Sequence, residues 1–330
     1  MTFTRRIFCA MTALGFAFSP CAHAQEWPAK QPIRVIVPYP AGGNADSAVR
    51  ALGEAIGGPL KQTVIVDNRP GASSIIGTEA VARAPADGYT IGVVSDSHAI
   101  NQAMAKYPKA AAILGAKVPY DAQRDFVPVA GTILIPLVLV VNPKVPARSV
   151  KELVQLSKSR NSGMNFGTMG TGSPWSIHMH QINEATGAVF VDVPYKGLAP
   201  AATDLIGGQT DTMLMPVHYA QQYIKTGKLV PIATLGAKRH PLLPEVPTLV
   251  ESGYPGLEIS NYIFFVAPAA TPPAIVQRLG QELNAALKTP AMKDKLAMSG
   301  DPYPAEPAEL SARLARDIAT YGKVIQNTLK

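Results

Sequence analysis

The run Ile33-Arg34-Val35-Ile36-Val37-Pro38-Tyr39-Pro40-Ala41-Gly42-Gly43-Asn44-Ala45-Asp46 decides the fold class of this chain. Its first five residues are mostly β-branched, which predicts a short buried strand. Pro and Gly residues then predict a tight turn. The apolar side chains of Val49, Leu52 and Ile56 follow at helical spacing. The run therefore predicts a strand, a glycine-rich turn and a helix in succession.

The same order repeats further along the chain. Residues 63–66 form the next β-branched run, 68–71 the next turn, and 90–94 a third strand after another helical stretch. Strands that alternate with helices build parallel sheets covered by helices on both faces. The sequence therefore predicts an α/β fold.

A second set of strands and helices begins at Ser149-Val150-Lys151-Glu152, the pattern of a capping box at a helix start. Two extended stretches, near 127–141 and 259–267, predict that the chain leaves a first lobe and later returns to it. We expect two doubly wound sheets joined by two crossing strands, with a cleft between the lobes for a small ligand. The expected division is lobe 1 at 25–130 and 262–330, and lobe 2 at 131–261.

The first 24 residues are typical of an export signal. Arg5 and Arg6 precede a short apolar stretch, and Ala22-His23-Ala24 supplies small residues for cleavage after Ala24. The run Thr4-Arg5-Arg6-Ile7-Phe8 resembles a twin-arginine signal, so the export route is open between the general secretory and twin-arginine pathways. A lipid anchor at Cys21 is a weaker alternative because Pro20 precedes it. The sequence predicts a periplasmic protein.

Composition excludes several classes of protein. The chain has 330 residues, of which 47% are hydrophobic and 16% charged, so intrinsic disorder is excluded. Cleavage after Ala24 removes both cysteines, Cys9 and Cys21, and two of the thirty Lys and Arg, which lowers the formal charge from +7 to +5. No basic cluster suggests nucleic acid. The longest apolar stretch of the mature chain, 127–141, is interrupted by two prolines and predicts no membrane span.

Glycine-rich loops after strands carry the main functional signal. The loop at 40–46 lies between a strand and a helix, where free N–H groups and the helix dipole attract anions. The loop at 168–173 repeats this chemistry and adds hydroxyls, and Ser95-Asp96-Ser97 follows a third strand. A single loop of this kind is more often only a tight connection. Several at corresponding strand ends favour an anion-binding cleft.

Enzyme motifs are absent from the sequence. It contains no nucleotide-binding GxGxxG, no Walker lysine, no GxSxG and no HExxH. His178 and His180 flank Met179, but a lone His-x-His is a weak metal signal, and we expect surface or loop histidines there. Trp175 lies beside the second glycine loop, where it is a candidate ligand contact, whereas Trp27 is expected to pack. No catalytic residue, cofactor or metal is predicted.

The same loops resemble the periplasmic solute receptors of tripartite tricarboxylate transporters, often called Bug-type receptors. The resemblance covers nearly all of the mature chain, in order, and its ordered set of short motifs is highly specific. The matching segments are 38–43 with Asp46 and Arg50, 68–72, 86–90, 98–101, 118–121, 170–173, 193–197, 207–209, 244–248 and 267–268.

The resemblance implies a two-lobed periplasmic binding-protein fold, type II-like, that closes on a small carboxylate. It implies a receptor that delivers this ligand to a membrane permease, and we expect it to be a monomer. In the family, a ligand carboxylate is held by the first-lobe loop and by backbone groups and waters deep in the cleft. The expected ligand-binding residues are Tyr39, Pro40, Ala41, Gly42, Gly43, Asp46, Ser95, Asp96, Ser97, Thr168, Gly170, Thr171, Ser173, Tyr195 and Met215.

Three positions depart from the family pattern. Ser176 and Asp192 each stand where many members have a histidine, and Met215 lies near a position that usually carries Asp or another polar residue. A methionine cannot neutralise the ammonium group of an amino acid, so this departure favours a plain carboxylate as ligand.

Two other functions use the same cleft. The chain is alternatively the ligand-sensing subunit of a signalling system, which differs only in its partner. An exported hydrolase or isomerase that uses Ser, Asp and His is less favoured, since no nucleophile motif is present.

Overall fold

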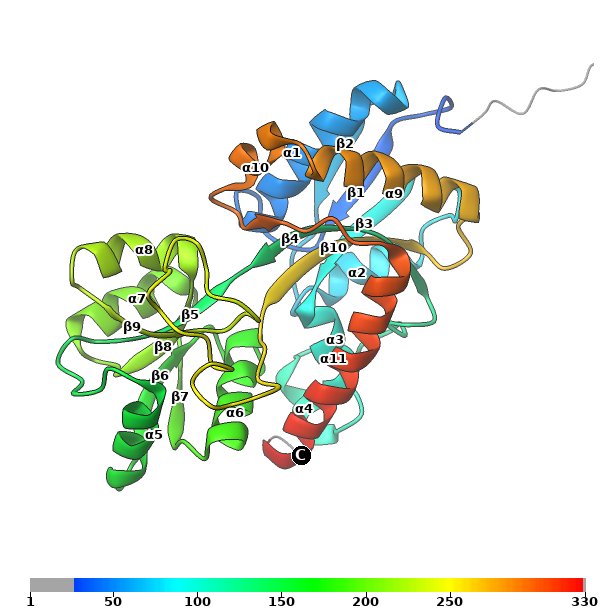
Figure 1. Cartoon of the computed structure of the whole chain (residues 1–330). Helices are drawn as coiled ribbons and strands as arrows, with labels where there is room; N and C mark the ends of the chain where they lie inside the picture. Colours follow the sequence, from blue (N-terminus) through cyan, green and yellow to red (C-terminus); the bar gives the residue numbers. More distant parts are fainter. Residues whose placement is uncertain (1–26, 329–330) are drawn as a thin grey trace, which may run out of the picture.

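The computed structural model describes residues 27–328, which form two lobes, each built on one β-sheet (Figure 1). The predicted export signal at residues 1–24 lies outside the described residues. Within residues 27–328, no helix is both long and apolar enough to cross a membrane.

The sheet of the first lobe has six strands in the order β11-β4-β10-β3-β1-β2. Strands β1, β2 and β3 run parallel, and β10 is antiparallel to both β3 and β4. The strands are β1 (Ile33–Val37), β2 (Val64–Asn68), β3 (Thr90–Ser95), β4 (Phe126–Ile135), β10 (Asn261–Pro268) and β11 (Asp301–Pro302).

The sheet of the second lobe has five strands in the order β7-β6-β8-β5-β9. Its parallel strands are β6, β7 and β8, and β5 is antiparallel to β8 and β9. In each sheet the antiparallel inner strand is the one that has just crossed from the other lobe. The strands are β5 (Leu137–Val141), β6 (Met164–Thr168), β7 (Phe190–Pro194), β8 (Thr212–Pro216) and β9 (Val230–Thr234).

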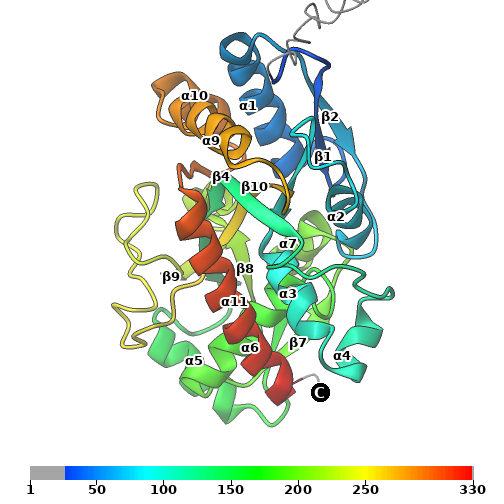
Figure 2. The same ribbon diagram turned by 90° about the vertical axis from the view of Figure 1, so that its right-hand side faces the viewer.

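Helices cover both faces of the first sheet (Figure 2). One face packs against α1, α9 and α10 and the other against α2, α3 and α11, while the short α4 packs beside α3. These helices are α1 (Asn44–Leu60), α2 (Ile75–Ala82), α3 (Asp96–Met104), α4 (Pro108–Ile113), α9 (Pro273–Leu287), α10 (Pro290–Leu296) and α11 (Pro307–Thr328).

Helices also cover both faces of the second sheet. One face packs against α5 and α6, and the other against α7 and α8. Figure 1 shows α11 running back beside α6, so the C-terminal helix of the first lobe also contacts the second lobe. These helices are α5 (Val150–Ser159), α6 (Pro174–Thr186), α7 (Leu198–Gly207) and α8 (Val217–Lys225).

The opening run folds as its residues predict. In β1, four of the five residues are buried, as expected for a parallel strand covered on both faces. Val49, Leu52 and Ile56 of α1 are buried in the same core. At the start of α5, Ser149 caps the N–H of Glu152 as predicted, but the Glu152 carboxylate accepts from the N–H of Arg148, one residue before the cap.

The extended stretch 127–141 is two strands that belong to different sheets. Strand β4 pairs with β10 in the first sheet as far as Ile135, and β5 begins the second sheet at Leu137. Pro136 therefore marks the first crossing, and residues 131–135 pair in the first sheet. The return crossing ends at Asn261, where β10 begins.

Candidate functional site

A cleft with a volume of about 780 Å³ lies between the two lobes. Loops at the carboxyl ends of the parallel strands of both sheets form its walls. Its lining residues are Pro38, Tyr39, Pro40, Gly43, Asn44, Ala45, Pro70, Gly71, Ser73, Ser74, Ser95, Asp96, Ser97, Asn101, Ile135, Met169, Gly172, Ser173, Pro174, Trp175, Gly197, Leu198, Pro216, Asn261, Tyr262 and Ile263.

Six helices of the described chain begin at this cleft, three from each lobe. The N-cap residues of all six line it. The first N–H groups of a helix lack partners within the helix, and the helix dipole adds partial positive charge there. The cleft therefore presents donors and positive potential suited to an anion. The N-caps are Gly43 of α1, Ser74 of α2, Ser95 of α3, Ser173 of α6, Gly197 of α7 and Pro216 of α8.

Cationic side chains are absent from the cleft wall that the described residues form. Within the described part of the chain, the lining contains no Lys, Arg or His. Its acidic residue is Asp96, which is 2% exposed and whose Oδ2 has no hydrogen-bond partner among the described residues. The Nε2 atom of His178 lies 3.5 Å from that oxygen and 2.7 Å from Oδ1 of Asn261.

His178 offsets the charge of Asp96. Burial alone lowers the pKa of an imidazole, but Asp96, together with hydrogen bonds to Gln181 and Asn261, outweighs burial here and raises the pKa of His178. His178 lies in α6 of the second lobe and Asp96 in α3 of the first, so this pair joins the lobes beneath the cleft. His178 is fully buried. The prediction of a surface or loop histidine is therefore wrong at this position.

Hydroxyl groups form a connected cluster on the first-lobe wall. The Tyr39 hydroxyl donates to Oγ of Ser95 at 2.8 Å, and Oγ of Ser97 lies 2.9 Å from Ser95 and 3.1 Å from Ser74. Burial raises the pKa of Tyr39, so its hydroxyl stays protonated at neutral pH. Each of these groups can turn a donor towards a bound anion.

The fold, the cleft and the family model agree. Residues 48–329 match the model of the tripartite tricarboxylate transporter family receptor. The chain belongs to this family. The receptor is 34% identical over 306 residues to protein BugT of Bordetella pertussis, which covers 92% of this chain and 91% of BugT.

Solved structures resemble the receptor over its length. The R. palustris protein Rpa4515, solved with adipate, has a TM-score of 0.75 at 27% identity and covers 91% of this chain and 98% of its own. MatC from Rhodopseudomonas palustris, solved with malate, has a TM-score of 0.72 at 26% identity, with coverage of 90% and 99%. These findings confirm the predicted family and the two-lobed, type II-like fold, and they identify a solute-binding receptor rather than an enzyme.

Seven of the fifteen expected ligand-binding residues line the cleft of the receptor. Six belong to the first lobe and one to the second, where the glycine loop enters α6. They are Tyr39, Pro40, Gly43, Ser95, Asp96, Ser97 and Ser173.

Asp46 lies behind the first-lobe wall. Its Oδ2 accepts from the Gly42 N–H at 2.9 Å and from Arg50, and its Oδ1 accepts from the Asn68 side chain at 2.9 Å. Burial alone raises the pKa of a carboxyl group, but these bonds outweigh it and lower the pKa of Asp46. Asp46 thus fixes the glycine turn at the start of α1. The neighbouring Ala41 and Gly42 are not lining residues either.

The remaining expected residues of the second lobe are not among the residues that line the cleft. Thr168 is buried and donates to Asp192, and Tyr195 donates to Asp204 at 2.9 Å. Burial, together with Asp204, raises the pKa of Tyr195 to about 12. Met215 is buried in the core between the sheet, α7 and α8, whereas the next residue, Pro216, lines the cleft. Gly170 and Thr171 are not among the lining residues.

The loop 70–74 is a part of the site that sequence reasoning missed. Ala72, Ser73 and Ser74 all have positive φ, and the Asn101 side chain donates to the carbonyl of Ser73 at 2.8 Å. Strained backbone of this kind is concentrated at ligand sites. The motif at 68–72 was part of the family resemblance, so a signal for this loop existed.

Apart from Trp175, the apolar side chains of the cleft wall are the other part of the site that the sequence did not predict. Trp175 was a candidate contact, and it lines the cleft with its indole Nε1 buried and without a hydrogen-bond partner in the described chain. The other apolar lining side chains are single residues of separate strands, loops and helices, with no motif to mark them. They include Ile135, Met169, Leu198 and Ile263.

Proposed function

We propose that this receptor captures a small carboxylate in its interlobe cleft, in the periplasm, and delivers it to the permease of a tripartite transporter. The observation that carries the proposal is the convergence of six helix N-termini on one cleft whose lining, among residues 27–328, contains no cationic side chain. Such a site recognises an anion through backbone N–H groups and hydroxyls.

The bonding follows from the groups on the wall. A ligand carboxylate accepts hydrogen bonds from N–H groups at the start of α1 and from the hydroxyls of Tyr39, Ser95 and Ser97. A hydrogen bond to a charged group contributes about 1.5–3 kcal/mol. Closure of the lobes replaces the water around the carboxylate with these donors, and the closed form is the one that the permease recognises.

The remainder of the ligand faces the apolar wall. Ile135, Trp175 and Leu198 suit a short hydrocarbon chain or ring. Adipate and malate, found in two similar structures, each carry two carboxylates on a short chain. Helix N-termini from both lobes allow one carboxylate on each side of the cleft. A tricarboxylate is disfavoured, because no Lys or Arg in the described lining would balance its third charge.

Calorimetric titration of the mature protein tests this function. The panel is adipate, malate, benzoate, citrate and aspartate, each at equal ionic strength. We expect one equivalent of a mono- or dicarboxylate to bind, and citrate to bind at least tenfold more weakly than the best ligand. Absence of binding by every acid would contradict a carboxylate receptor.

Uptake of the best ligand tests delivery. Cells that lack this receptor are expected to lose uptake of the labelled acid and to regain it with the wild-type gene. Uptake that is unchanged without the receptor, for a ligand that binds in vitro, would favour the sensing alternative.

A further inference from the structure

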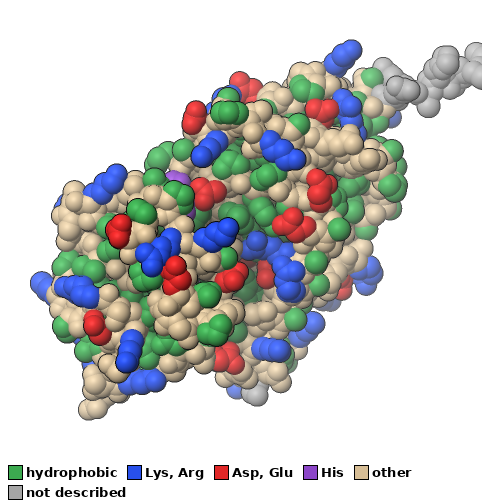
Figure 3. Space-filling model, viewed as in Figure 1, with side chains coloured by type: hydrophobic (Ala, Val, Ile, Leu, Met, Phe, Trp, Pro, Cys, Tyr) green, Lys and Arg blue, Asp and Glu red, His purple; other side chains and the backbone are tan. Residues whose placement is uncertain are grey.

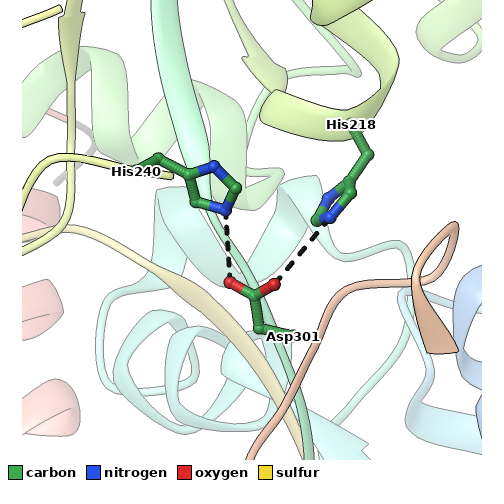
Figure 4. Close-up of side chains that lie close together, drawn as sticks. All are labelled: His218, His240 and Asp301. Carbon is green, nitrogen blue, oxygen red and sulfur yellow. Dashed lines mark hydrogen bonds and ion pairs between the residues drawn. The ribbon is translucent and has the colours of Figure 1, made fainter. Parts of the chain in front are cut away.

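Three side chains with metal-binding atoms meet at the junction of the two lobes, outside the carboxylate cleft. His218 lies in α8 and His240 in the loop after β9, both in the second lobe, whereas Asp301 lies in β11 of the first sheet. Figure 4 shows both imidazole rings directed at the Asp301 carboxylate. Among residues 27–328, no other group of three His, Cys, Asp or Glu comes as close together.

The spacing of the three groups is near that of a metal centre. Nε2 of His240 lies 3.3 Å from Oδ2 of Asp301, and Nε2 of His218 lies 3.8 Å from Oδ1. All three ligand atoms lie within 4.8 Å of one another. Bonds of about 2.0–2.1 Å to a tetrahedral Zn²⁺ place ligand atoms about 3.4 Å apart. Small side-chain rotations therefore bring the three atoms to binding distance.

The chemistry of the set suits a divalent transition metal. Two imidazole nitrogens and one carboxylate are ligands that Zn²⁺ and its neighbours accept, and three protein ligands leave a position for water. His240 is 9% exposed, so the surrounding protein restricts the position of its ring. The Asp301 side chain is 46% exposed, so a metal ion can reach its carboxylate from solvent. Charge is favourable as well, because the carboxylate partly neutralises a divalent ion.

Metal binding has an identifiable competitor. The Leu242 N–H donates to Nδ1 of His240 at 3.2 Å, which leaves the proton of the metal-free ring on Nε2, facing Asp301. A metal on Nε2 requires that proton on Nδ1 instead, so the bond from Leu242 is given up. The ion thus replaces a His–Asp hydrogen bond between the lobes with three metal–ligand bonds.

We propose that His218, His240 and Asp301 bind one divalent transition metal ion, and that this ion joins the two lobes. Two ligands come from the second lobe and one from the first. Any movement that separates β11 from α8 therefore breaks the centre. None of the three residues lines the carboxylate cleft, so the proposal does not depend on which ligand that cleft binds.

Metal titration of tag-free, chelator-treated mature protein tests the proposal. We expect one equivalent of Zn²⁺ by calorimetry, and Co²⁺ to give the visible absorption of a low-coordinate centre. His240→Gln and Asp301→Asn are each expected to weaken Zn²⁺ binding at least tenfold. His180→Gln is the matched control, because His180 lies outside the cluster, and it is expected to bind Zn²⁺ as the wild type does.

Thermal unfolding separates a metal centre from damage to the fold. Zn²⁺ is expected to raise the Tm of the wild type and of His180→Gln above their own metal-free values, but not that of His240→Gln, while all three proteins unfold cooperatively without metal. The proposal is overturned if Zn²⁺ does not bind in a 1:1 ratio. It is equally overturned if His240→Gln and Asp301→Asn keep wild-type affinity, or if His180→Gln loses it.

Discussion

The Ser176 hydroxyl donates a hydrogen bond to Oδ2 of Asp192 at 2.7 Å. These are two of the three positions expected to depart from the family pattern, and in this receptor they are partners. The other oxygen of Asp192 accepts from Thr168, the last residue of β6. One carboxylate therefore holds the end of β6 to the first turn of α6, on either side of the second glycine loop.

Asp192→Ala is expected to destabilise the receptor. Thr168 and Ser176 are both fully buried, and each loses its acceptor. Unsatisfied buried hydroxyls predict a loss of about 2 kcal/mol in the free energy of unfolding, measured by urea denaturation. Asp192→Asn keeps one carbonyl acceptor and is expected to lose less. An unfolding curve of Asp192→Ala that matches the wild type would contradict this role.

Ligand binding is expected to change the emission of Trp175. This residue lines the cleft, whereas Trp27, the other tryptophan of the chain, packs beside Tyr89 in the core of the first lobe. The fluorescence change on adding ligand should persist in Trp27→Phe and disappear in Trp175→Phe. A signal that follows Trp27 instead would mean that ligand binds elsewhere.

Ser97→Ala is expected to weaken ligand binding about tenfold, because it removes one hydroxyl from the cluster around Tyr39. Calorimetric titration with the best carboxylate measures the change. Ser159→Ala is the control, since Ser159 is an exposed residue of α5, and its affinity should equal that of the wild type. Unchanged affinity in Ser97→Ala would exclude this wall from the ligand contacts.

Acid is expected to destabilise the receptor through His98. Burial lowers the pKa of His98 from 6.5 to about 4, although a bond to the carbonyl of Ala122 acts in the opposite direction. The unfolded chain therefore binds a proton below pH 6.5 that the folded chain refuses until about pH 4. The stability that a neutral His98 contributes is lost as the pH falls through this window, by up to about 3 kcal/mol.

The variant His98→Gln isolates this effect in urea denaturation at pH 7 and pH 5. Gln keeps a donor for Ala122 and does not titrate, so the variant should lose less stability between the two pH values than the wild type. His178 has the opposite sign, since its raised pKa adds stability below its unfolded pKa that is lost as the pH rises. Equal pH dependence in the two proteins would contradict the assignment to His98.

The sequence predicted the parts of the fold that depend on local pattern. The strand at 33–37, the helix at Val49 and the crossing within 127–141 all follow from periodicity and from proline and glycine. Figure 3 shows acidic and basic side chains interspersed over the face in view. Local sequence patterns are sufficient to predict these parts because they depend on residues within the same helix or strand.

Long-range packing set the limits of prediction for the site. His178 is buried because α11 and Asn261, far along the chain, close over α6, and no local pattern of α6 reveals this. Met215 and Pro216 are neighbours, yet one is in the core and the other in the cleft. The apolar wall is formed by single residues from separate strands, helices and a loop of both lobes, which only the assembled lobes bring together.

The two crossings between the lobes also determine the order in which the protein can be completed. Residues 137–259 are contiguous and contain all strands and helices of the second lobe, which is therefore able to fold while the end of the chain is still being made. The first sheet has a gap between β3 and β4 until β10 is inserted, and α11 covers it later still. A chain that stops before Asn261 is thus expected to hold a folded second lobe, an unfinished first lobe and no binding activity.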